Sequence, residues 1–412
     1  MPAVFVTYSL AYLDRANFGF GAAAGLARTL HITPERSALL GALFFLGYFI
    51  FQVPGAAYAQ RTSIRKLIFG AQIAWGILAA LTGVVRTFWL LALDRLLLGV
   101  AESLILPALL ILLTDWFTRP ERSRANTLLI LGNPITVLWM SAITGYLIRL
   151  IGWQNAFIIE GIPSVIWAFV WLRLIADKPR NASWLPRVDA LALDTQLAKE
   201  QQDLPVVARA GDALRSKNVL LLGAQFFFWS VGLYGFILWL PSIISIGLAQ
   251  GIGATGLLNA APYLLAIILM LLVSRSSDRT QRRKAYVWPF LLAAAGALFL
   301  SYLFAGRNFW LAYGFTILAG GGMYASYGPF FAYISETLPK YVAGQAMAFI
   351  NSLGALGAFV GAWFIGVLQA RSHDARASFL AMAGSFLLSA LLMSMAADKG
   401  RSQPATYAER LT

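Results

Sequence analysis

The sequence contains no cysteine and only two histidines, His31 and His373. Without cysteine the chain can form neither a disulfide nor a thiolate metal site. Both histidines fall at the edges of predicted loops, which argues against a histidine relay or a metal cluster. A membrane-embedded enzyme would need clustered nucleophiles, histidines or metal ligands. These absences therefore argue against catalysis, and we expect no cofactor and no bound metal.

Charge is also scarce. Charged residues make up 12% of the 412 residues and hydrophobic residues 59%, whereas a soluble domain is typically about 25% charged. The mean hydropathy is +0.69. A soluble chain of this composition would expose too much apolar surface to water. The composition therefore predicts an all-α integral membrane protein whose surface faces the lipid bilayer.

Apolar runs of roughly 20 residues, the length that crosses a bilayer, recur about twelve times. One long polar segment divides them into six and six, the layout of transporters built from parallel repeats. The sequence thus predicts an N-terminal six-helix bundle (1–176), a cytoplasmic central loop (177–217), a C-terminal six-helix bundle (218–398) and a cytoplasmic tail (399–412). The expected spans are 3–26, 37–59, 66–86, 88–114, 124–149, 154–176, 218–248, 251–274, 285–305, 308–334, 343–369 and 376–396.

The formal net charge of +14 would suggest nucleic-acid binding in a soluble protein. Here, however, the positions of the basic residues follow the predicted membrane topology. If the N-terminus is cytoplasmic, 23 of the 32 Lys and Arg fall in cytoplasmic segments. This asymmetry is the one that the positive-inside rule describes. We therefore expect both termini in the cytoplasm, a bacterial inner-membrane location, and no nucleic-acid partner.

The charges deep inside predicted helices all lie in the first half. Asp14 and Arg15 interrupt the first apolar run, and Asp94, Arg95 and Glu102 interrupt the fourth. Charge at membrane depth is costly unless it is paired or lines a watery cavity, so such residues indicate a functional site. Arg95 and Glu102 are two helical turns apart and share one helix face. A glycine between them, Gly99, would let another helix approach closely.

Two interpretations of these charges stay open. Arg15 can clamp a substrate carboxylate through its paired donors, or it can be a structural partner of Asp14 or Glu102. Glu102 and Asp14 can carry protons, because an apolar cavity favours the neutral acid and a nearby guanidinium favours the carboxylate. They can instead be permanently ionised counter-ions.

The connection between the second and third helix of each half contains a related motif. Arg61 lies in the first copy, and Asp278 and Arg279 lie in the second. This register resembles the cytoplasmic gating loop of the major facilitator superfamily. The first copy departs from the pattern, because Gln60 replaces the usual acid and Ser63 the usual glycine, which puts a gating salt bridge there in doubt.

Further motifs narrow the resemblance to the anion:cation symporter family of that superfamily. It covers nearly the whole chain outside the central loop and the tail. The resemblance implies proton-coupled import of organic anions such as tartrate, hexonates, hexuronates, phthalate or hydroxyphenylacetate, with coupling and binding roles for Asp14, Arg15 and Glu102. The motifs are Tyr12–Asn17, Gly47-Tyr48, Gln52-Val53-Pro54, Gly99–Glu102 with Pro107, Asp115–Phe117, Glu121–Ala125, Gly152–Gln154, Glu160–Pro163 and Ile350–Gly354.

The second half contributes aromatic and amide groups in place of charge. Tyr324 and Tyr327 follow a glycine-rich stretch that leaves room near a cavity, and Asn351 is a similar candidate. Asn133 precedes Pro134, which is expected to break the fifth helix, and it can hydrogen-bond substrate or belong to a purely structural kink. With Tyr12 and Tyr48 beside Arg15, these residues form the predicted substrate site, and Arg95 is expected to tune Glu102.

The sequence thus predicts a monomeric, proton-coupled symporter that imports a small organic anion by alternating access. The alternatives are an organic-anion uniporter or antiporter and a membrane sensor that binds its ligand without transporting it.

Overall fold

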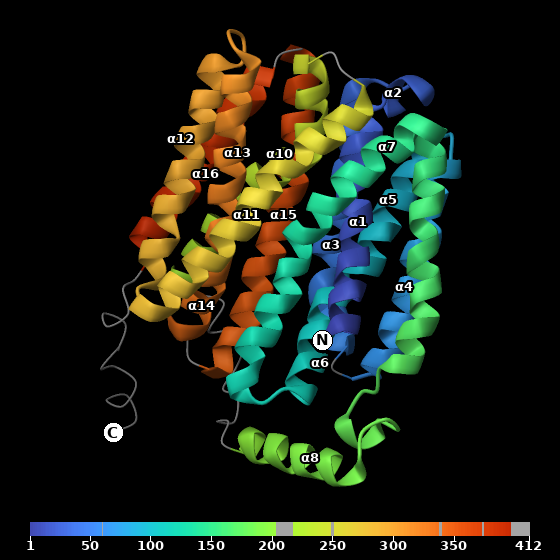
Figure 1. The fold of residues 1–412 in the computed structure, drawn as a ribbon, viewed down its shortest axis with the longest axis vertical. Coiled ribbons are helices and arrows are strands. Elements are labelled where there is room, and N and C mark those ends of the chain that lie inside the picture. Colours follow the sequence, from blue (N-terminus) through green and yellow to red (C-terminus); the bar gives the residue numbers. More distant parts are fainter. Residues whose placement is uncertain (60, 203–216, 249–250, 338–339, 373–374, 397–412) are drawn as a thin grey trace.

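The computed structural model describes residues 1–59, 61–202, 217–248, 251–337, 340–372 and 375–396. Within these residues the regular structure is entirely helical (Figure 1). The predicted tail, 399–412, lies outside them. The elements are α1 (Pro2–Ala23), α2 (Leu26–Thr29), α3 (Pro34–Ala59), α4 (Ile64–Val84), α5 (Phe88–Ser103), α6 (Ile105–Trp116), α7 (Arg119–Leu174), η1 (Pro179–Asn181), α8 (Arg187–Gln202), α10 (Lys217–Leu248), α11 (Ile252–Thr280), η2 (Arg283–Tyr286), α12 (Trp288–Phe304), α13 (Phe309–Ala325), α14 (Tyr327–Thr337), α15 (Lys340–Ser372) and α16 (Ala375–Met395).

These helices make twelve spans, because α5 with α6 forms one, α7 forms two, and α13 with α14 forms one. The two spans of α7 meet at Gly152, whose φ of 80° and ψ of 160° are not helical. Glycine adopts a positive φ without steric cost, which explains the position of this bend. Pro134, in contrast, lies inside α7 without ending it. The expectation that Pro134 breaks the helix was therefore wrong.

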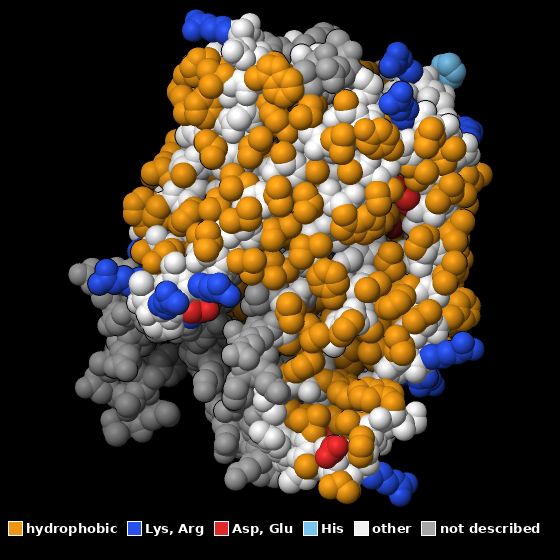
Figure 2. All heavy atoms as spheres, viewed as in Figure 1, with side chains coloured by type: hydrophobic (Ala, Val, Ile, Leu, Met, Phe, Trp, Pro, Cys, Tyr) orange, Lys and Arg blue, Asp and Glu red, His pale blue; other side chains and the backbone are white. Residues whose placement is uncertain are grey.

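The surface agrees with membrane insertion. In the described residues, nine helical segments are long and apolar enough to cross a membrane, and the segment 128–174 contains two spans. Large apolar side chains such as Trp89 and Leu150 point outward, each 79% exposed. Figure 2 shows hydrophobic side chains covering the middle of one face, while Lys and Arg gather toward its two ends. The membrane class predicted from composition is therefore supported by the placement of the side chains.

The helices form two groups that follow the chain order. In the first group α7 packs against α1 and α4, and α3 packs against α5; in the second, α10 packs against α15 and α16, and α12 against α13 and α16. Figure 1 shows the blue-to-green helices on one side and the yellow-to-red helices on the other. In the described part of the predicted polar central segment, the short η1 is followed by α8, which lies across the end of the bundle that carries the N-terminus.

The main contacts between the two groups are those of α1 with α10, α3 with α15, and α7 with α11. At the α7–α11 crossing the backbones touch, because a Cβ added at Gly256 would lie 2.3 Å from the Ser141 carbonyl oxygen. The Ser141 hydroxyl also accepts a hydrogen bond of 2.8 Å from the Asn259 amide. Gly256 lies near the start of α11, and Ser141 lies in the first span of α7 before the Gly152 bend. The crossing therefore holds the groups together toward the end that carries this bend.

We expect Gly256→Leu to destabilise the protein, because any side chain at this position must push α7 and α11 apart. Overpacking of this kind costs about 1–3 kcal/mol. The matched control is Gly296→Leu on α12, where an added Cβ would meet no atom within 4 Å. Thermal unfolding of the two purified variants in detergent measures the difference. Equal unfolding midpoints would contradict the close approach.

Candidate functional site

The buried ion pair between α1 and α5 forms the centre of the candidate site. Arg15 Nε donates a hydrogen bond of 2.8 Å to Glu102 Oε2, and the two side chains are 7% and 0% exposed. The second Glu102 oxygen, Oε1, is buried without a hydrogen-bond partner among the described residues. The sequence left open whether Arg15 pairs with Asp14 or with Glu102, and the structure pairs it with Glu102.

Asp14 lies beside this pair without joining it. Its side chain is 4% exposed, and within the described part of the chain neither of its carboxyl oxygens has a hydrogen-bond partner. Consecutive residues on a helix point in different directions, so Asp14 and Arg15 do not face each other. Asp14 is thus a second buried acid next to the ion pair.

Aromatic rings enclose the guanidinium of Arg15. Its Cζ lies 5.2 Å from the ring centroids of Tyr12 and Phe44 and 4.8 Å from that of Tyr48. A guanidinium over aromatic faces is attracted by their π-electrons, and the attraction strengthens when water is excluded. The structure therefore brings Tyr12 and Tyr48 to Arg15, as the sequence predicted.

Phe44, which the sequence analysis did not single out, lies against both buried arginines. Arg95 Cζ is 5.5 Å from the Phe44 centroid and 4.8 Å from that of Phe18. The available signal was the spacing between Phe44 and Tyr48, which places both on one face of α3. Arg95 thus reaches the ion pair through a shared ring, and the described contacts include no salt bridge between Arg95 and Glu102.

Gly99 brings α3 close enough for these ring contacts. A Cβ added at Gly99 would lie 1.9 Å from the Phe44 carbonyl oxygen, so the backbones of α3 and α5 touch. The close approach predicted for Gly99 is confirmed. On the same helix Asp94 accepts a hydrogen bond of 2.8 Å from the Thr82 hydroxyl of α4. Asp94 is therefore a packing partner of α4, apart from the ion pair.

The second half supplies a cluster of polar aromatics. The Tyr324 hydroxyl donates to Asn133 Oδ1 at 3.4 Å, and the rings of Tyr324 and Tyr327 stack with centroids 5.8 Å apart. This cluster crosses between the halves, because Asn133 belongs to α7. Tyr234 makes a second crossing, since its hydroxyl lies 3.4 Å from that of Tyr12. Asn351 is half-buried on α15, and no described contact joins it to either cluster.

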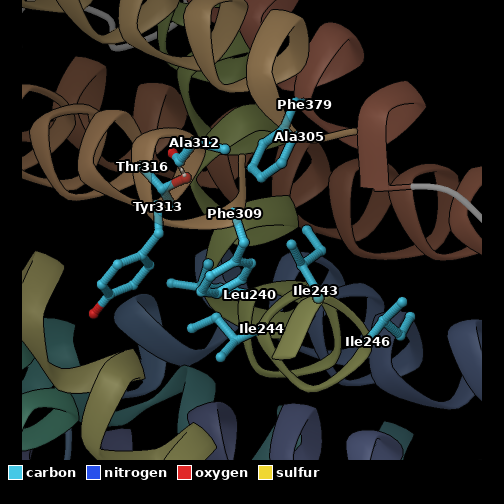
Figure 3. Close-up of a pocket in the computed structure, with 11 residues that line it drawn as sticks. Leu240, Ile243, Ile244, Ile246, Ala305, Phe309, Ala312, Tyr313, Thr316 and Phe379 are labelled. Carbon is cyan, nitrogen blue, oxygen red and sulfur yellow. Dashed lines mark hydrogen bonds between the residues drawn. The ribbon is translucent and has the colours of Figure 1, made fainter. Parts of the chain in front are cut away.

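The apolar cavity in Figure 3 lies elsewhere in the second half. It holds about 120 Å³ between α10, α13 and α16. Its two polar side chains already have partners, because Tyr313 donates to the Leu258 carbonyl at 2.6 Å and Thr316 to the Ala312 carbonyl at 2.9 Å. No charged residue lines it. It therefore offers nothing that would bind an anion.

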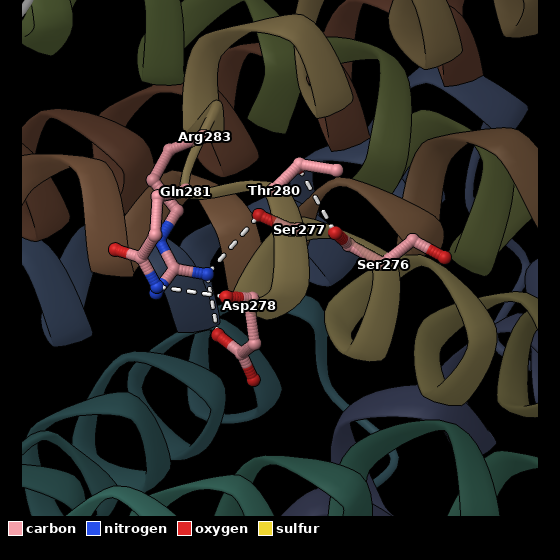
Figure 4. A network of polar contacts seen from close by, with 6 residues as sticks. All are labelled: Ser276, Ser277, Asp278, Thr280, Gln281 and Arg283. Atoms are coloured by element: carbon pink, nitrogen blue, oxygen red, sulfur yellow. Dashed lines mark hydrogen bonds and ion pairs between the residues drawn. The ribbon is translucent and has the colours of Figure 1, made fainter.

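The predicted gating-loop residues lie at the end of the bundle near α8. Asp278 accepts a hydrogen bond from Arg283 of its own loop and forms an ion pair with it (Figure 4). Arg61 and Arg279 are exposed. Gln60 lies outside the described residues.

In the first half an acid from elsewhere joins the corresponding loop. Asp177, at the end of α7, accepts hydrogen bonds from the Ser63 hydroxyl at 2.6 Å and from the Arg65 backbone N–H at 2.8 Å. Ser63 is the N-cap of α4, so Asp177 fixes the start of that helix. Sequence reasoning missed this contact because Asp177 lies more than a hundred residues further along the chain.

Comparison with known proteins identifies the fold. Residues 4–362 match the family model described as Major Facilitator Superfamily. The chain belongs to this superfamily. The solved structure of the xylose transporter XylE from E. coli, in a partially occluded inward-open conformation, superposes with a TM-score of 0.76 at 15% identity, over 98% of this chain and 99% of XylE. The fold class predicted from the sequence is confirmed.

Two curated proteins are similar to this chain along most of their length. A protein of Agrobacterium vitis named "Putative tartrate transporter" is 32% identical over 98% of this chain and 90% of its own. A quinolone resistance transporter of Acinetobacter baumannii is 31% identical over 90% of this chain and 86% of its own. The chain is therefore a multi-pass membrane transporter and not an enzyme.

We expect Phe44→Leu to destabilise this transporter by about 1–3 kcal/mol, because it removes two buried cation–π contacts that are each worth up to about 2 kcal/mol. Phe45→Leu is the control, since Phe45 is also buried and packs on Tyr234 while the described cation–π contacts do not include it. The unfolding midpoints in detergent report the difference. A Phe45→Leu loss as large as the Phe44→Leu loss would show that the shared ring does not hold the arginines.

Proposed function

We propose that this transporter is a proton-coupled symporter that imports a small organic anion across the bacterial inner membrane, as a monomer with its N-terminus in the cytoplasm. The observation that carries the proposal is the buried Arg15–Glu102 pair. Few groups other than a substrate anion and a proton can compete for such a pair inside an apolar bundle. The name of the Agrobacterium vitis relative supports an organic anion as the substrate class.

Coupling follows from an exchange of partners at Arg15. The guanidinium presents paired donors that match a carboxylate, and in the structure one of them is occupied by Glu102. A substrate carboxylate that docks on Arg15 displaces Glu102. Glu102 is then a buried charge without its counter-ion, a state that costs several kcal/mol. Protonation removes that cost, so anion binding and proton binding favour each other.

The remaining candidate residues have supporting roles in this proposal. Asp14 is a second acid that can take up a proton beside the pair. Tyr12 and Tyr48 hold the Arg15 guanidinium and line the carboxylate position. Arg95 biases Glu102 through the shared Phe44 ring. The rest of the anion contacts Asn133 of the first half and Tyr324, Tyr327 and Asn351 of the second half, and these residues select its shape.

Alternating access completes the cycle. The α7–α11 crossing closes the bundle toward the end opposite the N-terminus, which in the proposed topology is the external end. Rocking of the two halves about the midplane site would open this end and close the other. In this scheme Arg61, Asp278 and Arg279 form contacts that close the cytoplasmic end when the external end is open.

We expect Glu102→Gln to abolish proton-driven accumulation of substrate while it preserves counterflow, because glutamine cannot release a proton but leaves the cavity intact. The assay uses proteoliposomes and a panel of tartrate, hexonates, hexuronates, phthalate and hydroxyphenylacetate. Asp94→Asn is the control, since it neutralises a buried acid on the same helix. If the Glu102→Gln variant still concentrates substrate under a proton gradient, Glu102 is not the carrier.

We expect Arg15→Ala to weaken substrate binding at least about 30-fold, since truncating one side of a buried charge pair costs about 2–5 kcal/mol. Arg15→Lys keeps the charge but loses the forked geometry, and it should bind more weakly than wild type without unfolding. Arg95→Lys is the control at the other arginine on Phe44. Thermal-shift titration with the same panel measures the affinities. Wild-type affinity in Arg15→Ala would exclude the carboxylate clamp.

Proton movement during uptake distinguishes the alternatives. A symporter takes up protons together with the anion, so the external medium becomes more alkaline as substrate enters. A uniporter moves no protons, and an antiporter moves them in the opposite direction. A sensor that cannot transport would bind substrate without counterflow.

A further inference from the structure

A half-buried carboxyl, Glu160, lies apart from the Arg15–Glu102 pair and has no role in the proposed symport. Glu160, in the second span of α7, contacts Asn17 of α1 and Thr144 of the first span. The Thr144 hydroxyl lies 2.6 Å from Glu160 Oε1 and 3.1 Å from Asn17 Oδ1. The Asn17 amide nitrogen contacts Glu160 Oε2. Asn17 and Thr144 are each 1% exposed. The three side chains thus form a closed ring of three polar contacts.

The number of available hydrogen atoms determines whether all three contacts of this ring can be hydrogen bonds. Three hydrogen bonds need three hydrogens, and the threonine hydroxyl has one. The asparagine amide can donate through its nitrogen but not through its oxygen, so it supplies one. The third must come from Glu160. Exchanging the amide oxygen and nitrogen of Asn17 reverses the direction of the ring without changing the count. Only a protonated Glu160 therefore closes all three contacts.

The electrostatic surroundings of Glu160 agree with a neutral acid. The hydrogen bonds described for it are those to the uncharged groups of Asn17 and Thr144, and the ion pairs in the described residues do not include it. An unpaired carboxylate inside a membrane span is costly. Among the residues whose side chains the structure describes, the ionisable groups on α7 and on the helices packed against it are Tyr8, Tyr12, Asp14 and Arg15 on α1; Arg65 and Lys66 on α4; Asp115 on α6; Tyr263, Arg275, Asp278 and Arg279 on α11; and Tyr146, Arg149 and Arg173 on α7.

Three arginines on α1 and α4, or next to them, have described partners other than Glu160. Arg15 donates to Glu102. Arg65 is held by the Leu172 carbonyl at the far end of α7, with its Nε at 2.8 Å. Arg86, just beyond the end of α4, donates to the Gly83 carbonyl at 2.8 Å. Each of these cations thus has a described partner other than Glu160.

We propose that Glu160, Asn17 and Thr144 form a second proton-binding site, which ties α1 to α7 when the proton is bound. Loss of the proton would leave two hydrogens for three contacts, and one link between the helices would open. Asn17 follows Arg15 by two residues on α1, so the helix that carries the anion clamp also carries this tie. A role of the tie in transport rests on the proposed symport; the bound proton itself does not.

Infrared difference spectroscopy of the full-length protein tests the bound proton directly. We expect a carbonyl stretch from a protonated carboxyl that shifts in D₂O and is absent in Glu160→Gln. Asp189→Asn, which removes an exposed acid on α8, should retain the band. The proposal would be overturned if wild type and Glu160→Gln gave identical spectra in the region of the protonated-carboxyl stretch. Because no substrate or gradient is used, this outcome would leave the proposed symport untouched.

The pH dependence of stability gives an independent test. If folded Glu160 holds a proton that the unfolded chain releases near the ordinary glutamate pKa of about 4.3, stability falls as pH rises from that value until the folded site loses its proton. Glu160→Gln supplies its hydrogen permanently through the amide, so its unfolding midpoint should fall less over this range than that of wild type. Asp189→Asn should follow wild type. Thr144→Val, which opens the ring, should lower the pH at which the infrared band disappears. Equal pH slopes for wild type and Glu160→Gln would contradict a bound proton.

Discussion

The free energy of a guanidinium and a carboxylate buried in an apolar bundle constrains the rest of this structure. Neither Arg15 nor Glu102 can stay ionised at this depth alone, so α1 and α5 must present them to each other. Membrane lipid supplies no water to replace a missing partner. The pair therefore sets the relative position of two helices that are far apart in sequence, and it makes that position depend on anything that can take the place of either partner.

Helix α3 packs against α5 and places the Phe44 ring beside the Arg15–Glu102 pair. These surroundings make the pair responsive to a competing carboxylate. Gly99 removes the side chain that would hold α3 away, and the Phe44 ring then lies against both arginines. A ring attracts a guanidinium without consuming its hydrogen-bond donors. Arg15 is thus held in place while part of its donor set remains available to a carboxylate. A hydrogen-bonding residue at position 44 would have competed with substrate for those donors.

Much of this arrangement could be predicted, because it depends on periodicity and on the cost of buried charge. The membrane fold, the deep residues Arg15 and Glu102 and the close approach at Gly99 all follow from local sequence. The boundary between the proposed domains and the roles of the individual site residues remain predictions.

What the sequence did not reveal depended on contacts between distant segments. Asp14 and Arg15 are neighbours in the chain, yet a helix turns them to different sides, so Arg15 pairs with α5. Asp177 supplies an acid to the loop between α3 and α4, which lacks the acid usual for its motif. No spacing rule connects Asp177 with that loop. Pro134 was expected to break the fifth helix, but proline is tolerated within a span whose freed carbonyl finds other partners. Gly152 provides the actual bend through its positive φ.

The two halves handle polarity differently, and this difference bears on the mechanism. The first half contains four deep acids: Asp14 without a described hydrogen-bond partner, Asp94 bonded to Thr82, Glu102 paired with a cation, and the half-buried Glu160 in a ring of neutral groups. The tyrosine hydroxyls of the second half contact neutral groups of the first half, at Tyr12–Tyr234 and Asn133–Tyr324. Contacts of 3.4 Å between neutral groups are weak compared with a buried ion pair. These two contacts can therefore break at lower cost than the Arg15–Glu102 pair, which lies within the first half. Separation of the halves at the α7–α11 crossing also requires the 2.8 Å hydrogen bond between Asn259 and Ser141 to break.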